Sequence, residues 1–207
     1  MYGNNGPQEL GGIDGIAGIA DRQIGPTCGF EAVENIVQLF VPARNDLSST
    51  TLLPMASQAG YLVPGVHAPM LVTPAFRPLL ARFGIATTWA SFDHQQLIDA
   101  LAQNRVAIAI IDAYYLGSAT YRFRNSWHAV IITNFVTDPT GTWVQRYAGI
   151  DSNFPSQIVT WPVEAVDRAA KATGNRPPLL ITDRATYFGR HNVRYTLQPD
   201  GRVYRRG

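Results

Sequence analysis

Apolar positions in the first half of the chain recur mainly at helical spacing. Between Cys28 and Phe40 they fall on one face of a helix, which is expected to end before Pro42. Three further helices are expected, at Leu52–Gly60, at Pro74–Phe83 with Thr73 as its cap, and from the caps Ser91 and Asp93 to Gln103. The helical pattern therefore dominates the first hundred residues.

The second half of the chain has the pattern of strands. Val106–Asp112 is continuously apolar, which predicts a buried strand. Trp127–Val136 and Trp143–Asp151 flank the turn Asp138-Pro139-Thr140-Gly141, so these two segments predict an antiparallel hairpin. The remaining elements expected are strands at Ile85–Ala90, Leu179–Thr182, Asn192–Leu197 and 202–206, and a short helix at Val163–Lys171. Helices followed by mostly antiparallel strands indicate an α+β domain.

The domain organisation follows from length and composition. A chain of 207 residues with 46% hydrophobic content suits one compact domain with a sizeable core. Residues 1–22, rich in Gly and Asn, are expected to form an extended N-terminal arm, and residues 23–207 a single domain. No apolar run approaches the ~18 residues that a membrane-spanning helix requires, so no membrane-spanning segment is expected.

Charge and cysteine content narrow the function classes. The net charge of +2 is too small to indicate a nucleic-acid partner, and the one dense basic cluster, Arg202, Arg205 and Arg206, is expected to be a solvated end. A single cysteine excludes an internal disulfide, and no Cys/His set has the spacing of a zinc site. No cofactor or metal is therefore predicted.

The cellular location is left open by the sequence. The N-terminus has no basic region followed by an apolar core, so it does not predict a secretory signal. Lys171 is the only lysine beside sixteen arginines, which fits either a GC-rich genome or a protein delivered into eukaryotic cells that avoids ubiquitin attachment. The expected location is thus either the cytoplasm or a cell reached through a specialised secretion system.

The lone cysteine carries the strongest chemical signal. Cys28 follows a Gly-Pro-Thr break and opens the first predicted helix, where the helix dipole favours thiolate over thiol. A cysteine nucleophile needs a base, and His128 begins the first strand of the predicted hairpin. Asp151 ends the second strand, at the same open end, so it can orient the imidazole. Gln23 could donate its side-chain amide to an oxyanion, beside the backbone N–H of Cys28.

Each of these residues has a competitor. His67, His94 and His191 are the other candidate bases, but none of them begins a strand whose partner ends in a carboxylate. Asn153 could replace Asp151 as the group that orients the histidine. Cys28 itself could be a small buried hydrophobe, and Gln23 a solvent-facing loop residue.

The motifs around these residues resemble those of papain-like cysteine peptidases, most of all the bacterial branch of bacteriocin-leader (double-glycine) peptidases. The resemblance rests on Gln23 with Thr27–Ile36, on Trp127–Val130, and on Gly149–Asn153. It implies a papain-like fold with the nucleophile at a helix start, and a thiol hydrolase that cleaves peptide bonds. It assigns Cys28 as nucleophile, His128 as base, Asp151 as orienting residue and Gln23 as oxyanion donor. Four residues separate Gln23 from Cys28, one fewer than in papain.

Two other functions remain compatible with the sequence. The same triad serves glutamine deamidases and transglutaminases, and the lysine-poor composition suits such an effector or toxin acting on a protein of a host or rival cell. Alternatively, Cys28 is part of the core and the chain is a non-enzymatic binding domain. The partner expected of a peptidase, or of a deamidase or transglutaminase, is a protein or peptide substrate.

Overall fold

The computed structural model describes most of the chain. The described residues are 8–11, 27–41, 44, 46–65, 69–117, 120–124, 126–138, 140–154, 158–174, 178–186, 194–197 and 203–205. No helix within these ranges is long and apolar enough to cross a membrane.

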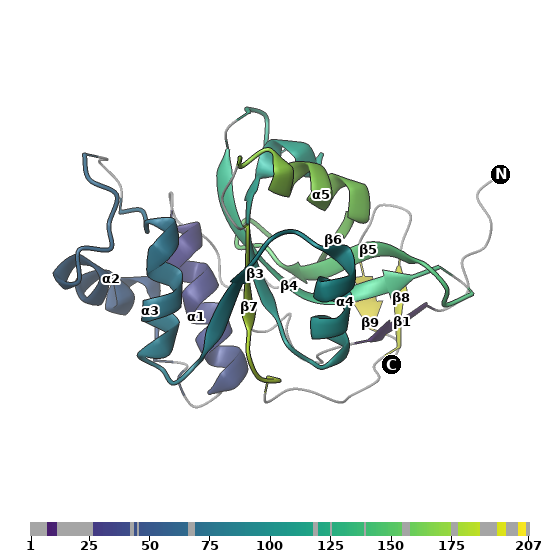
Figure 1. The fold of residues 1–207 in the computed structure, drawn as a ribbon, viewed down its shortest axis with the longest axis horizontal. Coiled ribbons are helices and arrows are strands. Elements are labelled where there is room, and N and C mark those ends of the chain that lie inside the picture. Colours follow the sequence, from purple (N-terminus) through teal and green to yellow (C-terminus); the bar gives the residue numbers. More distant parts are fainter. Residues whose placement is uncertain are drawn as a thin grey trace.

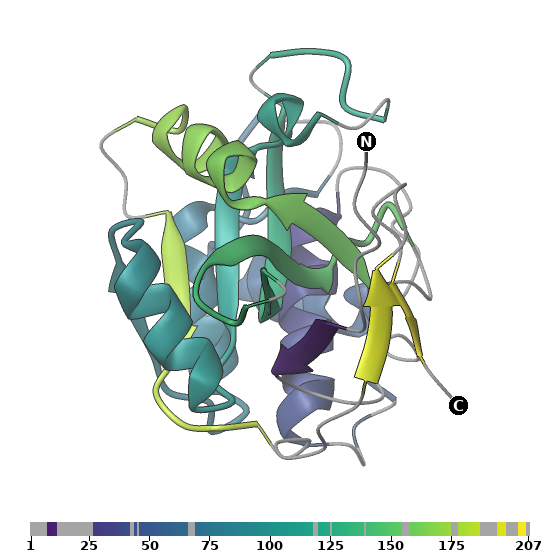
Figure 2. The same ribbon diagram turned by 90° about the vertical axis from the view of Figure 1, so that its right-hand side faces the viewer.

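One antiparallel sheet organises the described part of the chain. Its strands follow the order β2-β7-β3-β4-β1-β8-β9, and β5 and β6 extend from the second edge of β4. The strands are β1 (Gln8–Gly11), β2 (Thr87–Ala90), β3 (Ala107–Asp112), β4 (Trp127–Thr137), β5 (Val144–Ile150), β6 (Val159–Pro162), β7 (Leu179–Thr182), β8 (Arg194–Leu197) and β9 (Val203–Arg205). Figure 2 shows β1 beside β8, at the end of the sheet where β9 also lies.

Helices cover both faces of the sheet (Figure 1). They are α1 (Cys28–Phe40), α2 (Ser49–Gln58), α3 (Phe76–Ala81), α4 (His94–Ala102) and α5 (Val163–Lys171), with short 3-10 turns η2 (Thr73–Ala75) and η3 (Ala113–Leu116). The helices α1, α2 and α3 pack on one face, and α4 and α5 on the other. The apolar run in β3 serves both cores, because Ile108 and Ile110 face the first group of helices while Ala109 and Ile111 face the second.

The helix α1 is buried on almost every side, which fixes the position of its first residue. Val33, Ile36 and Val37 have no exposed surface, and the polar side chains of Glu31 and Glu34 are buried as well. A helix enclosed in this way cannot shift without opening the core. Cys28 is therefore held at a fixed place relative to β4, against which α1 packs.

The strands β4 and β5 form the antiparallel hairpin that the sequence predicts, with one close approach. Ile131 pairs with Ile150, and the pairing is irregular between Ile132 and Asn134. At Gly149 an added Cβ would lie 1.8 Å from the carbonyl oxygen of Ile131, so only glycine fits there. The glycine lets the two strands approach just before β5 ends.

The α+β class expected from the sequence is confirmed. The helices α4, between β2 and β3, and α5, between β6 and β7, lie among strands, as their expected positions along the chain require. The strand β6 was not expected, because a four-residue segment ending in Pro162 carries little periodicity. The strand β1 lies inside the expected arm and pairs with β4 and β8. The division into an arm and a domain stays a prediction.

Two helix starts also differ from expectation. The helix α2 begins before Leu52, because the Ser48 hydroxyl accepts a hydrogen bond from the Thr51 backbone N–H at 3.3 Å and the Thr51 hydroxyl accepts one from the Ser48 backbone N–H at 2.9 Å. Thr73 does not cap α3; it starts the 3-10 turn that precedes α3. Pro78 is compatible with α3 because it stands in the first helical turn, where backbone N–H groups have no helical partner.

Candidate active site

Cys28 is the first residue of α1 and lies half-buried at the boundary between α1 and the sheet. The Thr27 carbonyl starts the helix by accepting the N–H groups of Phe30 at 2.8 Å and Glu31 at 3.0 Å. The Cys28 sulfur meets other partners: the His128 side chain and the backbone N–H groups of Gly29 and Ala129. All of these groups donate to a thiolate, which favours its negative charge.

His128 is the second residue of β4 and lies between Cys28 and Asp151. Its Nε2 is 2.9 Å from Oδ1 of Asp151. With Nε2 committed to the carboxylate, Nδ1 is the ring nitrogen left to meet the sulfur. The pairing of Ile131 with Ile150 explains the contact, because it puts His128 and Asp151 on the same face of the hairpin. The imidazole is only 5% exposed and the carboxylate 0%.

The charges of Cys28, His128 and Asp151 stabilise one another. Burial alone would raise the pKa of the Cys28 thiol, but the hydrogen bond and charge of His128 outweigh it and hold that pKa below its ordinary value. Burial would likewise lower the pKa of His128, yet hydrogen bonds to Asp151 and Cys28 raise it to about 10. The arrangement thus favours a thiolate beside an imidazolium at neutral pH.

The Asp151 carboxylate has three donors. Oδ1 accepts from His128 and from the backbone N–H of Asn153 at 3.0 Å, and Oδ2 accepts from the Tyr121 hydroxyl at 2.6 Å. Burial would raise the pKa of Asp151, but its hydrogen bonds, first of all that with His128, hold it below its ordinary value. Tyr121 was missed by the sequence reasoning, because it comes from an irregular connection that no periodicity places.

Asn153, the alternative orienting residue, also lies in this network. Its Nδ2 donates to the Tyr121 hydroxyl at 3.0 Å and approaches Nε2 of His128 at 3.4 Å. An amide nitrogen only donates, so it cannot accept the Nε2–H of an imidazolium. The carboxylate of Asp151 can, and its contact is shorter.

The remaining candidates are elsewhere or outside the described residues. His94 starts α4 on the other face of the sheet, where its Nδ1 lies 2.8 Å from the Tyr147 hydroxyl and its ring stacks on that of Tyr147. Gln23, His67 and His191 all lie outside the described residues. The proposed oxyanion role of Gln23 therefore stays a prediction.

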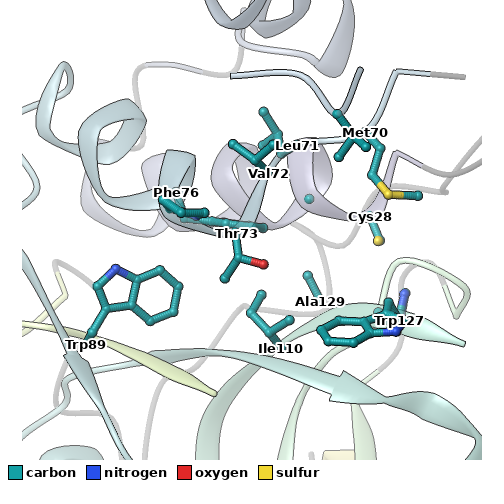
Figure 3. A pocket seen from close by; sticks show the side chains of 14 residues that line it. Cys28, Met70, Leu71, Val72, Thr73, Phe76, Trp89, Ile110, Trp127 and Ala129 are labelled. Carbon is teal, nitrogen blue, oxygen red and sulfur yellow. The ribbon is translucent and has the colours of Figure 1, made fainter. Parts of the chain in front are cut away.

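A large apolar pocket adjoins the sulfur. It has a volume of about 710 Å³. Its lining residues are Cys28, Gly29, Val63, Met70, Leu71, Val72, Thr73, Pro74, Phe76, Trp89, Ile110, Trp127, His128 and Ala129. Figure 3 shows Cys28, Met70 and Trp127 at one end and Trp89 at the other, with Thr73 between them. A bound molecule can therefore reach from the thiol along a mostly apolar surface.

The pocket owes its shape to both layers of the fold. Leu71, Val72 and Phe76 come from the connection into α3 and from α3 itself, whereas Ile110 and Ala129 come from β3 and β4. The space thus lies between the helices and the sheet, with the nucleophile candidate at the edge. Within the described ranges, no group of His, Cys, Asp and Glu side chains is arranged to hold a metal ion.

Comparison with known proteins supports the fold. No protein-family model matches the chain, and no curated protein matches it. Among solved structures, the chain is similar to the crystal structure of a protein described as a "putative C39-like peptidase from Bacillus anthracis". The TM-score is 0.56 at 10% sequence identity, and the match covers 86% of this chain and 98% of the other. The chain therefore has the fold of a papain-like peptidase.

Proposed function

We propose that this protein is a thiol hydrolase that cleaves a peptide bond of a protein or peptide substrate, with Cys28 as nucleophile. The observation that carries the proposal is the row of side chains from the Cys28 sulfur through His128 to the buried Asp151, at the mouth of an apolar pocket. The likeness to a C39-like peptidase adds support at the level of the fold.

In the proposed reaction the Cys28 thiolate attacks the carbonyl carbon of the scissile bond and forms a tetrahedral oxyanion. His128 then gives its Nδ1 proton to the leaving amine, and the carbonyl re-forms as a thioester. Water, deprotonated by His128, hydrolyses the thioester and releases the acid. Asp151 keeps the imidazole oriented and stabilises its positive charge throughout. Gln23 and the backbone N–H of Cys28 are the proposed donors to the oxyanion.

The pocket supports substrates with a bulky apolar group near the cleaved bond. About 710 Å³ exceeds the volume of any single side chain, and the walls consist mainly of Leu, Val, Phe, Trp and Ile side chains. Burying a large aliphatic or aromatic side chain there contributes about 1.5–3 kcal/mol. We therefore expect peptides with such residues to be cleaved in preference to polar ones.

The lone cysteine makes the test direct. Any covalent thiol label on the native protein must sit on Cys28, because the chain has one cysteine. An epoxide or iodoacetamide probe should label it, and Cys28→Ala should abolish cleavage of a peptide library read by mass spectrometry. Cys28→Ser, which keeps the size and position of the group, serves as the matched control for folding and should be nearly inactive. Retained cleavage by Cys28→Ala would refute the assignment.

The deamidase alternative uses the same first step on a side-chain amide. Intact-mass analysis of treated proteins separates the two reactions, because deamidation adds about one dalton per site whereas proteolysis creates new termini. The binding-domain alternative predicts a thiol whose pKa is at or above the usual ~8.5 and which alkylates slowly. The partners of Cys28 argue against it, since they lower the pKa of the thiol. The bacteriocin-leader branch and the delivered-effector role remain further proposals.

A further inference from the structure

The two oxygens of the Asp151 carboxylate have different partners. Oδ1 receives His128 and the N–H of Asn153, and Oδ2 receives the Tyr121 hydroxyl at 2.6 Å. We propose that Tyr121 is a positioning residue, whose hydroxyl fixes the carboxylate so that Oδ1 stays directed at His128. This inference rests on the proposed function, because it concerns the same row of side chains.

The hydroxyl has a defined direction in this network. An ionised carboxylate only accepts, so Tyr121 must donate its proton to Oδ2. Its oxygen in turn accepts from Nδ2 of Asn153 at 3.0 Å. Burial and the negative charge of Asp151 raise the pKa of Tyr121 well above its ordinary value, so the phenol keeps the proton that it donates. The hydroxyl thus acts as donor and as acceptor, and rotation of the Asp151 carboxylate would break its hydrogen bond with Tyr121.

The ring of Tyr121 adds a second effect. Its centroid lies 5.3 Å from that of the His128 imidazole, at an interplanar angle of 46°. The ring thus covers part of the pair formed by His128 and Asp151, both of which are buried. Water kept away from the pair cannot compete for Oδ1 or Oδ2, which strengthens the hydrogen bonds between the charged groups.

The connection that carries Tyr121 is held at its base. Oδ1 of Asp112, at the end of β3, accepts the backbone N–H of Tyr114 at 3.2 Å and of Ser126 at 3.1 Å. The N–H of Ala113 donates to the Ser126 carbonyl at 2.9 Å, which joins the two ends of the connection. The Arg124 guanidinium lies 5.7 Å from the centre of the Tyr114 ring. These contacts brace the segment from which Tyr121 reaches Asp151.

The test is the pH dependence of Cys28 alkylation by iodoacetamide in wild type and Tyr121→Phe. The hydrogen bond from Tyr121 helps keep the pKa of Asp151 low, along with that of His128, the other titratable group in contact with the carboxylate. Without the hydroxyl, Asp151 takes up its proton at a higher pH as the solution is acidified, and the thiolate–imidazolium pair loses its support there. We expect the acid limb of the alkylation profile to move to higher pH by about one unit.

Tyr115→Phe is the matched control. Tyr115 lies on the same connection and contacts Tyr114 edge-on at 5.3 Å, so the same atom is removed without touching the carboxylate. Its alkylation profile should coincide with that of wild type. A Tyr121→Phe profile that also coincides with wild type, from folded protein with a reactive Cys28, overturns the positioning role and leaves the proposed function standing. A wild-type Cys28 that reacts no faster than a free thiol overturns both.

A second measurement avoids any substitution at Tyr121. Protein grown on 3-fluorotyrosine carries a more acidic phenol, which donates more strongly to Oδ2, so the acid limb should move to lower pH. The Tyr121→Phe variant labelled in the same way should lose this shift. An acid limb that stays where it is in the fluorinated wild type overturns the proposal.

Discussion

Replacement of Asp151 by Asn tests which group orients His128. The substitution keeps the size of the side chain and leaves an amide oxygen to accept from Nε2, but it removes the charge that now lies 2.9 Å from the imidazole. A hydrogen bond to a charged group contributes about 1.5–3 kcal/mol. The same range corresponds to about one to two pKa units, or a 10- to 150-fold loss of kcat/KM.

The sign of the pH effect follows from the raised pKa of His128, which is about 10. The imidazolium, and with it the ion pair with Cys28, is present below that pKa and is lost as the pH rises through it. Asp151→Asn lowers the pKa of His128. The imidazolium attracts the anionic reagent iodoacetate, so the alkaline limb of Cys28 alkylation by iodoacetate should move down by about one to two pH units. Alkylation that is quenched after set times at each pH, and read by mass spectrometry, measures this limb without a known substrate.

Asn153→Ala is the matched comparison. It removes an amide that approaches Nε2 at 3.4 Å but keeps the backbone N–H that donates to Asp151. Its alkaline limb should stay within a few tenths of a pH unit of wild type. If Asn153→Ala shifts the limb more than Asp151→Asn does, Asn153 is the orienting residue and the reasoning from donors and acceptors is wrong.

Three further predictions address the fold and the pocket. Gly149→Ala should lower the free energy of unfolding by about 1–3 kcal/mol and slow Cys28 alkylation, because its Cβ meets the Ile131 carbonyl and forces β5 away from β4; thermal melting and labelling check this. Ile110→Trp should fill the pocket and raise KM for peptides with bulky apolar residues, while Cys28 alkylation stays at the wild-type rate. Leu52→Ala should lower the free energy of unfolding by about 2–5 kcal/mol in urea titration without shifting the alkylation pH profile, since Leu52 is fully buried in α2.

Part of the site could be predicted from the sequence because Cys28 and His128 belong to regular elements and Asp151 directly follows one. Cys28 starts a strongly periodic helix. The turn between β4 and β5 predicts an antiparallel hairpin, in which the start of the first strand lies beside the end of the second. The contact between His128 and Asp151 therefore follows from local patterns.

The features that the sequence does not predict are missed for physical reasons too. Tyr121 reaches Asp151 from a connection of irregular backbone, where neither a period of two nor one of 3.6 assigns a direction to the side chain. The pocket lies between the connection into α3, with α3 itself, and the strands β3 and β4, a tertiary arrangement that no single segment encodes. The strand β6 was overlooked because four residues are too few for a pattern, and its position depends on pairing with β5.

The central claim is that His128 activates Cys28, and the pH dependence of Cys28 alkylation in wild type and His128→Ala tests it most directly. The account predicts a wild-type thiol that remains reactive well below the usual thiol pKa of about 8.5, because His128 stabilises the thiolate. In folded His128→Ala the burial of Cys28 is no longer offset by a cation, so reactivity should appear only at or above that pH. Identical profiles in the two proteins would contradict the claim.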